Sequence, residues 1–186
     1  MRIFIAIELD NSLKERLSDI QNKILETGAD IKVTPLSNIH LTMRFLGEIE
    51  EKEIPKIKNI LENLAKNTFA FEISTGSIGA FPSVNSCRVI WLGIENGKGT
   101  LVNIAQQLNA LLKNNGFPHE DKDFSAHITL GRVRSSKNKL RLEEFLNQNI
   151  TLDARMEIEH IVLFKSTLTK KGAIYGRLYQ ANFKKI

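Results

Sequence analysis

Two short stretches of the chain carry a histidine followed two positions later by a threonine: His40 with Thr42, and His127 with Thr129. Each stretch is apolar around these residues and is predicted to form a β-strand. Alternate side chains of a strand share a face, so each histidine points the same way as its threonine. Because buried imidazole and hydroxyl groups need partners, we expect these polar faces to line a ligand-accessible space.

The two His-Thr pairs stand at equivalent places in an apparent internal repeat. The predicted strand at 3–8 superposes on the one at 90–95 at a constant offset of 87 positions, and the same offset brings His40 onto His127 without a gap. We therefore expect a duplication whose pseudo-twofold axis places the pairs on opposite sides of one cleft. Two unrelated units of equal length are the alternative.

Two imidazoles across a cleft suit the hydrolysis of a phosphodiester. Water attacks phosphorus on one side while the leaving oxygen departs on the other, and each side needs one proton transfer. With an ordinary pKa of ~6.5, one neutral histidine can accept a proton and one charged histidine can donate one. Thr42 and Thr129 can donate hydrogen bonds to the nonbridging oxygens. The spacing does not say whether His40 or His127 is the acid, and this chemistry requires no metal.

Two arginines near the pairs are candidates for phosphate contact. Arg132 lies five positions after His127, so strict alternation puts it on the opposite face. It needs a bulge, a twist or a strand end to reach the cleft. Arg44 lies four positions after His40 and has the parity that would share its face. For Arg44 two alternatives stay open, a substrate contact and a solvated surface charge.

The remaining reactive residues lack such support. His119 lies in a polar loop and His160 on a predicted strand, and neither has a histidine at the repeat offset. Cys87, the single cysteine, is predicted to be a small residue at a strand entrance rather than a nucleophile. The sequence has no His-x-x-x-His or similar chelating spacing, so we predict neither a metal site nor a cofactor.

Apolar periodicity predicts strands and helices that alternate along the chain. Besides the strands already named, we expect helices at about 12–27, 51–66, 100–114 and 140–147, and strands at about 69–80, 155–165 and 174–183. No linker or low-complexity run interrupts residues 1–186, which we treat as one bilobal domain. The predicted class is α+β, with two mostly antiparallel sheets facing a central cleft and the helices outside.

Composition narrows the setting without deciding the function. The 186 residues are 42% hydrophobic and 25% charged, as in an ordinary globular domain, and their net charge of +5 weakly favours a polyanionic partner. No stretch approaches the ~18 apolar residues of a membrane span, and the first residues have no signal-peptide pattern. One cysteine cannot form an internal disulfide. We therefore expect a cytoplasmic monomer without a membrane partner.

These motifs together resemble the two-histidine phosphoesterase superfamily, and within it the bacterial and archaeal 2′-5′ RNA ligase or RNA 2′,3′-cyclic phosphodiesterase family. The likeness spans the whole chain. Its blocks are residues 1–7, 38–47, 79–83, 89–93, 124–132 and 163–166, followed by Gly172 and Tyr175. Two copies of the His-x-Thr motif, in order and correctly flanked, are specific for this family.

The resemblance implies hydrolysis of an RNA 2′,3′-cyclic phosphate end to a 2′-phosphate. It assigns His40 as the proton donor to the leaving 3′ oxygen and His127 as the proton acceptor from water. It also implies substrate binding by Thr42, Thr129 and Arg132, with RNA ends, tRNA fragments among them, as the partner. Some members of the family run the chemistry in reverse and join RNA ends through a 2′-5′ bond without ATP, so the physiological direction stays open.

Two positions depart from the family pattern. Val33 stands where an aromatic residue is often found before the first histidine, and Ala126 where a proline often precedes the second. The first bears on how a base is stacked and the second on backbone stiffness, and neither removes a catalytic group.

Two other functions stay open. One is a related phosphoesterase acting on a small cyclic nucleotide or on 2′-5′ oligoadenylate, and the other is an RNA-binding module without catalysis.

Overall fold

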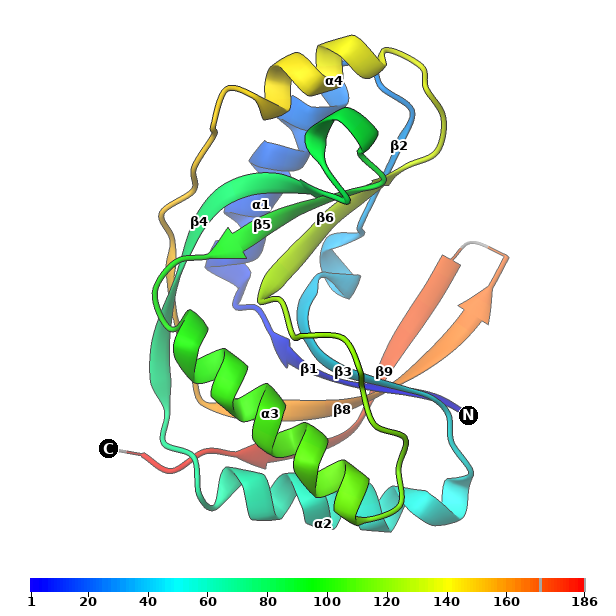
Figure 1. Ribbon diagram of the computed structural model, residues 1–186, viewed down its shortest axis with the longest axis vertical. Helices are drawn as coiled ribbons and strands as arrows, with labels where there is room; N and C mark the ends of the chain where they lie inside the picture. Colours follow the sequence, from blue (N-terminus) through cyan, green and yellow to red (C-terminus); the bar gives the residue numbers. More distant parts are fainter. Residues whose placement is uncertain (171, 186) are drawn as a thin grey trace.

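The computed structural model describes residues 1–170 and 172–185, which form nine strands and four α-helices (Figure 1). The elements are, in chain order, β1 (Arg2–Glu8), α1 (Asn11–Glu26), β2 (Ile31–Val33), β3 (His40–Glu48), α2 (Ile54–Ala65), β4 (Phe71–Phe81), β5 (Val89–Ile94), α3 (Lys98–Asn114), β6 (His127–Val133), α4 (Lys139–Leu146), β7 (Arg155–Ile158), β8 (His160–Thr169) and β9 (Gly172–Asn182). The four predicted helices are confirmed, the second of them beginning as a 3-10 turn at Glu51–Glu53 that continues into α2.

One antiparallel sheet runs through the molecule in the order β7-β4-β5-β6-β3-β1-β8-β9, with β2 paired to β6. In Figure 1 this sheet curls between an upper and a lower lobe. The strands of the two lobes meet where Leu41 of β3 pairs with Ile128 of β6. The predicted α+β class is confirmed, and the two sheets that we expected are joined into one by this contact.

The segment predicted as one strand at 155–165 is two strands with different neighbours. β7 pairs with β4, whereas β8 pairs with β1 and β9. Glu159 lies between them, outside both strands. The apolar alternation of β7 ends there, because Glu159 and His160 are both polar and residues 161–164 are apolar in succession, so the sequence held a sign of the change of neighbour that the prediction did not use.

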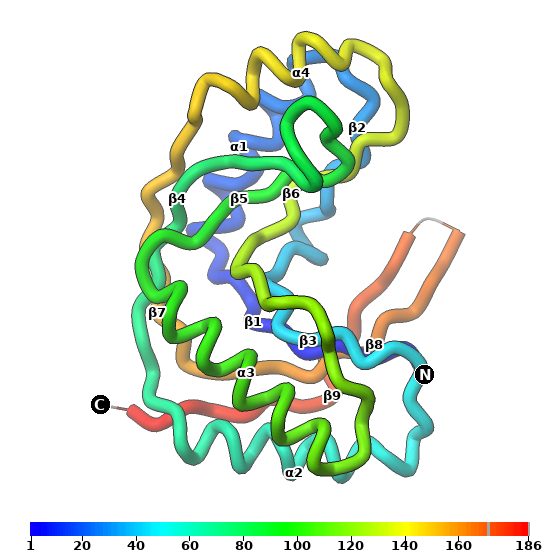
Figure 2. The backbone as a smooth tube through the Cα atoms, viewed as in Figure 1, coloured from blue at the N-terminus to red at the C-terminus, as the bar shows by residue number. Residues whose placement is uncertain are grey.

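Helices cover the outside of the curled sheet, α1 and α4 on the upper lobe and α2 and α3 on the lower (Figures 1 and 2). The Asp10 side chain accepts a hydrogen bond from the Leu13 amide at 2.7 Å and so caps the start of α1. The buried stripe of α1 includes Leu17 and Ile24, whereas Leu25 is 42% exposed. Leu25 lies about 100° around the helix from Ile24 and therefore falls outside the stripe.

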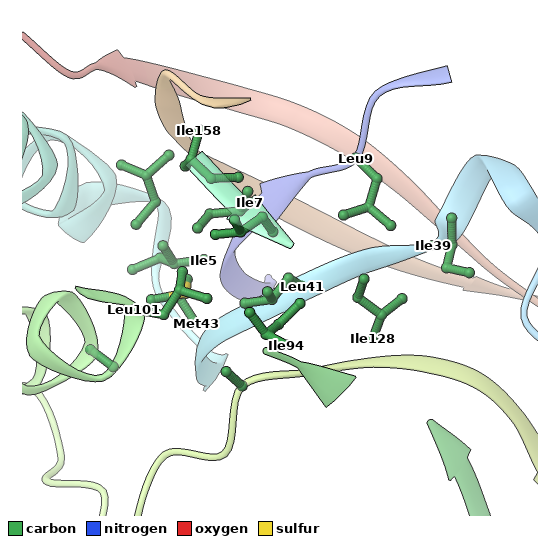
Figure 3. Close-up of a cluster of buried hydrophobic side chains, with 14 of the residues drawn as sticks. Ile5, Ile7, Leu9, Ile39, Leu41, Met43, Ile94, Leu101, Ile128 and Ile158 are labelled. Atoms are coloured by element: carbon green, nitrogen blue, oxygen red, sulfur yellow. The ribbon is translucent and has the colours of Figure 1, made fainter. Parts of the chain in front are cut away.

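The two faces of β1 pack against different apolar clusters. Ile5 and Ile7 lie with Leu41 and Met43 of β3 in the larger cluster, beside Leu101 of α3 (Figure 3). The smaller cluster consists of Phe4, Ala6, Val162 and Phe164. Fully burying one such large side chain stabilises a fold by about 1.5–3 kcal/mol. The strand that carries His40 is therefore held beside a well-packed core.

Candidate active site

Both predicted histidines line one cavity of about 730 Å³. His40 is the first residue of β3 and His127 is the first residue of β6, the two strands through which the lobes meet. Thr42, Thr129 and Arg132 line the same cavity. The fold thus brings together these five residues, and Arg44, for which two alternatives stayed open, lines the cavity as well.

Each imidazole is held by the same local hydrogen bond. His40 Nδ1 lies 2.7 Å from the carbonyl oxygen of Asn38, and His127 Nδ1 lies 2.7 Å from the carbonyl oxygen of Ser125. A carbonyl oxygen can only accept, so Nδ1 carries the proton in both neutral rings. Nε2 is therefore the nitrogen that can exchange a proton with a ligand.

The two threonines differ in their contacts. Thr42 Oγ1 lies 2.9 Å from His40 Nε2, so its hydroxyl can donate to the neutral ring. The Thr129 side chain is half-buried in the cavity wall and has no hydrogen-bond partner in the described part of the chain. One hydroxyl is therefore already fixed on its histidine, and the other is free to meet a ligand.

His40 lies among aromatic rings. Its ring centroid is 4.9 Å from that of Phe4 and 5.5 Å from that of Tyr175. Burial in these surroundings lowers the pKa of His40 below its usual 6.5; the hydrogen bond to the Asn38 carbonyl works against this shift, and the charge of His127 adds to it. The neutral form of His40 is therefore favoured in the free protein.

A bulge in β6 brings Arg132 to the cavity. Two successive residues of β5 pair with Thr129 and Gly131, so Leu130 is an extra residue on β6. A bulge of this kind reverses the alternation beyond it, which puts Arg132 on the face of Thr129. Arg132 is exposed and lines the cavity. The bulge supplies the change of face that the sequence argument required.

A bulge at the equivalent place in β3 turns Arg44 away from the face of His40. Two successive residues of β1 pair with Thr42 and Arg44, so Met43 is the extra residue. The expectation that Arg44 shares the face of His40 is therefore wrong, because it assumed unbroken alternation. The surface-charge alternative is also wrong, since the Arg44 side chain is only 7% exposed.

Arg44 holds the loop that leads from α3 into β6. Its Nη1 lies 2.5 Å from a carboxylate oxygen of Glu120, and its Nη2 donates to the Pro118 carbonyl at 2.6 Å. Asn109 of α3 bonds the backbone N–H and carbonyl of Glu120 through its own side-chain amide. These contacts tie the approach to His127 to the strand that carries His40.

The other reactive side chains are placed differently. His119 lies in the loop, as predicted, but it lines the cavity. His160 begins β8, and its Nε2 lies 3.7 Å from a Glu8 carboxylate oxygen. Burial raises the pKa of the Cys87 thiol, the charge of Glu143 adds to the shift, and Cys87 lines a different hollow. A protonated thiol there is a poor nucleophile.

Within residues 1–170 and 172–185, no three or more histidine, cysteine, aspartate or glutamate side chains are grouped so that they could hold a metal ion. The same residues include no helix that is both long and apolar enough to span a membrane.

The model of the family described as "LigT like Phosphoesterase" matches the chain twice, over residues 7–91 and 92–175. The chain belongs to this family. Each matched stretch contains one His-x-Thr motif, so the family model of the LigT-like phosphoesterases covers one motif in each half of the chain. The two matches support the internal duplication, which stays a prediction.

Relatives of this LigT-like phosphoesterase match it over nearly its whole length. The RNA 2′,3′-cyclic phosphodiesterase of Methanocaldococcus jannaschii is 38% identical over 176 residues, covering 94% of this chain and 96% of its own. That of Thermotoga maritima is 33% identical over 183 residues, covering 98% and 96%. A crystal structure of a Thermus thermophilus protein, 25% identical, superposes with a TM-score of 0.84 and covers 98% of both chains.

Escherichia coli LigT in complex with 3′-AMP has the same fold. It superposes with a TM-score of 0.77 over 98% of this chain and 97% of its own, at 21% sequence identity. The curled antiparallel sheet with four helices is therefore the architecture of the LigT-like phosphoesterases.

Sequence reasoning missed two aromatic walls of the cavity in this LigT-like phosphoesterase. Phe45 is 57% exposed and lines the cavity, because the β3 bulge turns it to the face of His40. Tyr175 lines the cavity as well, although the sequence marked it only as part of a family block. The repeat offset carries a signal for Phe45, since it lies 87 positions before Arg132 and both residues follow a bulge.

Proposed function

We propose that this LigT-like phosphoesterase hydrolyses RNA 2′,3′-cyclic phosphate ends to 2′-phosphates, with His40 and His127 as its acid and base. One observation carries the proposal: two imidazoles with the same Nδ1 anchor line one cavity together with two threonines and an arginine. Relatives that match the chain over nearly its whole length are named RNA 2′,3′-cyclic phosphodiesterases, which supports the same substrate class.

In the proposed reaction, water attacks phosphorus as the bond between phosphorus and the 3′ oxygen breaks. His127 takes a proton from the water, and His40 gives a proton to the 3′ oxygen. The product keeps its phosphate on the 2′ oxygen and has a free 3′ hydroxyl. The two rings return to their starting states by exchanging one proton with solvent in opposite directions.

Thr129 and Arg132 stabilise the charge that builds on the nonbridging oxygens, and Thr42 joins them once His40 is protonated, because a charged Nε2 no longer accepts the hydroxyl proton. A hydroxyl donor aimed at these oxygens acts more strongly in a partly dehydrated cavity than in water. The guanidinium of Arg132 can donate two parallel hydrogen bonds to a phosphate. Each threonine follows its histidine by two strand positions, so the donors and Nε2 converge on one phosphate.

The lowered pKa of His40 fits an acid that its substrate charges. A proton donor must be protonated, and burial disfavours that form in the free protein. A phosphate anion beside the ring favours the charged form and raises the pKa of His40 again. In the proposed cycle His40 therefore gains its proton as the substrate binds.

The aromatic walls of the cavity favour a nucleotide as the substrate. Phe45 and Tyr175 present rings to the cavity, and proteins that bind single-stranded RNA stack bases on such rings. These rings can offset the missing aromatic residue at Val33. The complex of Escherichia coli LigT with 3′-AMP supports a nucleotide site in this fold.

A panel of substrates tests the proposal. We expect RNA with a 2′,3′-cyclic phosphate end to have the highest kcat/KM, the product to be the 2′-phosphate, and EDTA to leave the rate unchanged. Higher kcat/KM for a 3′,5′-cyclic nucleotide or for 2′-5′ oligoadenylate would contradict the RNA-end assignment. Binding without turnover of any substrate would leave only the non-catalytic alternative.

Adding RNA with a 5′ hydroxyl tests the reverse reaction. The monomeric state and the cytoplasmic location also stay predictions.

A further inference from the structure

A second hollow, of about 650 Å³, lies at the end of β6 away from His127. Its walls come from the connection between β4 and β5, the end of β6 and the start of α4. In Figure 1 these segments form the top of the upper lobe. The charged residues that line it are Arg88, Arg132, Arg134, Lys137, Lys139 and Glu143.

The hollow carries positive charge that is not neutralised. Lys139 Nζ lies 3.4 Å from a carboxylate oxygen of Glu143, the acidic residue of the described wall. Arg88, Arg134 and Lys137 are exposed, and none has an ion-pair partner among the residues that the structure describes. Like charges gathered without counter-charges repel one another, so the cluster suits a polyanionic ligand.

Arg132 connects this basic hollow to the catalytic cavity, because it lines both. On the neighbouring strand, Lys32 of β2 pairs directly with Arg132 and adds a further cation to the row. Residues of a strand rise by roughly 3.3 Å each, so Arg132 lies less than about 20 Å along β6 from His127. Cations therefore continue from the proposed phosphate site to the hollow.

We propose that the basic hollow binds the phosphodiester backbone of the RNA strand on the 5′ side of the reacting end. This inference rests on the proposed function, which places the terminal nucleotide at His40 and His127. The described wall of the hollow has no aromatic side chain, whereas Phe45 and Tyr175 line the catalytic cavity. The hollow can therefore contact phosphates without stacking bases, so its binding depends on salt and not on base sequence.

Two substrates and two double variants test the inference. The substrates are a mononucleotide 2′,3′-cyclic phosphate and an RNA of about six nucleotides with the same end. Arg134→Ala with Lys137→Ala removes two cations from the hollow. Lys23→Ala with Lys66→Ala is the matched control, since it removes two exposed lysines at α1 and the end of α2. The quantity measured is the ratio of kcat/KM for the RNA to that for the mononucleotide, between about 50 and 200 mM salt.

We expect the Arg134/Lys137 variant to lower this ratio ~10-fold at low salt. Its plot of log kcat/KM for the RNA against log salt should also be flatter by about 1.4, because each single-strand phosphate contact contributes about 0.7 to the slope. The control should keep the wild-type ratio and slope. An unchanged ratio and slope in the Arg134/Lys137 variant would overturn the inference, as would an equal change in the control.

A binding measurement separates this inference from the proposed function. If the wild-type protein hydrolyses neither substrate, the proposed function fails. The affinity for a labelled RNA with a 3′-phosphate end, measured by fluorescence anisotropy, still reports on the hollow. A ~10-fold weaker affinity in the Arg134/Lys137 variant and no weakening in the control supports the hollow as a strand-binding site, and equal affinities refute it.

Discussion

The half-sites around His40 and His127 share one backbone frame and differ in what surrounds it. In both, the strand begins at the histidine, and a carbonyl oxygen two residues earlier lies 2.7 Å from Nδ1. The His40 ring packs against Phe4 and Tyr175, whereas the His127 ring meets Phe81 edge-on at 5.1 Å. The shared hydrogen bond sets which nitrogen faces the cavity in both half-sites, and burial lowers the pKa of His40.

This difference breaks the equivalence of the two half-sites that the repeat alone implies. Two identical half-sites would hold one neutral and one charged ring near their shared pKa without fixing which ring is charged. Burial lowers the pKa of His40 in the free protein, which makes its charge depend on a bound anion. Different packing of the two copies can therefore bias which ring carries the proton.

Removing either histidine should have the largest effect. We expect His40→Ala and His127→Ala each to lower kcat ~100-fold or more, because each removes one proton transfer. The double variant should lose little beyond the more damaging single change, since the two residues act as a unit. His160→Gln is the control, as His160 begins β8 and is not in the described wall of the cavity. Near wild-type kcat in either alanine variant would refute the paired mechanism.

Removing either threonine hydroxyl should have the next largest effect. We expect Thr42→Val and Thr129→Val each to lower kcat about 10-fold or more, since each removes a donor to the nonbridging oxygens. Thr42→Val should also move one flank of the pH profile, because Oγ1 of Thr42 contacts His40 Nε2. Thr129→Val should lower the rate without moving a flank. Thr→Ser variants, which keep the hydroxyl, are the controls. If both valine variants moved a flank of the pH profile equally, the proposed difference between Thr42, which contacts His40, and Thr129, which does not, would be contradicted.

Breaking the contact between Arg44 and Glu120 should have a smaller effect. Glu120→Gln leaves a buried guanidinium facing a neutral amide, so we expect unfolding in urea to show a loss of about 2 kcal/mol. The loss should stay below that of a fully buried pair, because Glu120 is 43% exposed and partly screened by solvent. We also expect a fall in kcat of a few fold from the loosened approach to His127.

The exposed pair of Glu53 and Lys56, 3.9 Å apart, provides the control for this comparison. Glu53→Gln should change the free energy of unfolding by less than about 0.5 kcal/mol. Equal losses of unfolding free energy in the Glu120→Gln and Glu53→Gln variants would show that the contact between Arg44 and Glu120 stabilises the protein no more than an exposed surface pair does.

The smallest expected effect is electrostatic. Replacing His127 by alanine removes a positive neighbour, so the pKa of His40 should rise. It should stay below the ordinary value of histidine, since burial is the larger cause of the shift. Titration of the ring resonances by NMR measures this directly. A pKa of His40 that falls in the His127→Ala variant would mean that the two rings do not sense each other as described.

The sequence pattern predicted the parts of the molecule that depend on short spacings. Each His-x-Thr pair spans three residues of one strand, so the alternation of a strand was enough to put both side chains on one face. The helices were predicted for the same reason, because their apolar stripes repeat within a few residues. Arg132 could be named together with its condition, a bulge, a twist or a strand end, but the sequence did not show which of these occurs or where.

Features that depend on long-range pairing could not be predicted in this way. The bulges at Met43 and Leu130 add one apolar residue to an apolar strand, which leaves no mark in the pattern. This is why the parity of Arg44 misled and why Phe45 was missed. The partners Arg44 and Glu120 are 76 positions apart, and only the folded chain brings them together.

The pH dependence of kcat on a 2′,3′-cyclic phosphate between about pH 5 and 9 tests the paired roles of His40 and His127 most directly. One ring must be neutral while the other is charged, so we predict a bell-shaped profile whose apparent pKa values belong to the pair. His40→Ala and His127→Ala should each lose one flank of the bell in whatever activity remains. A wild-type rate that rises steadily with pH, following hydroxide alone, would show that no general acid takes part and would contradict the mechanism.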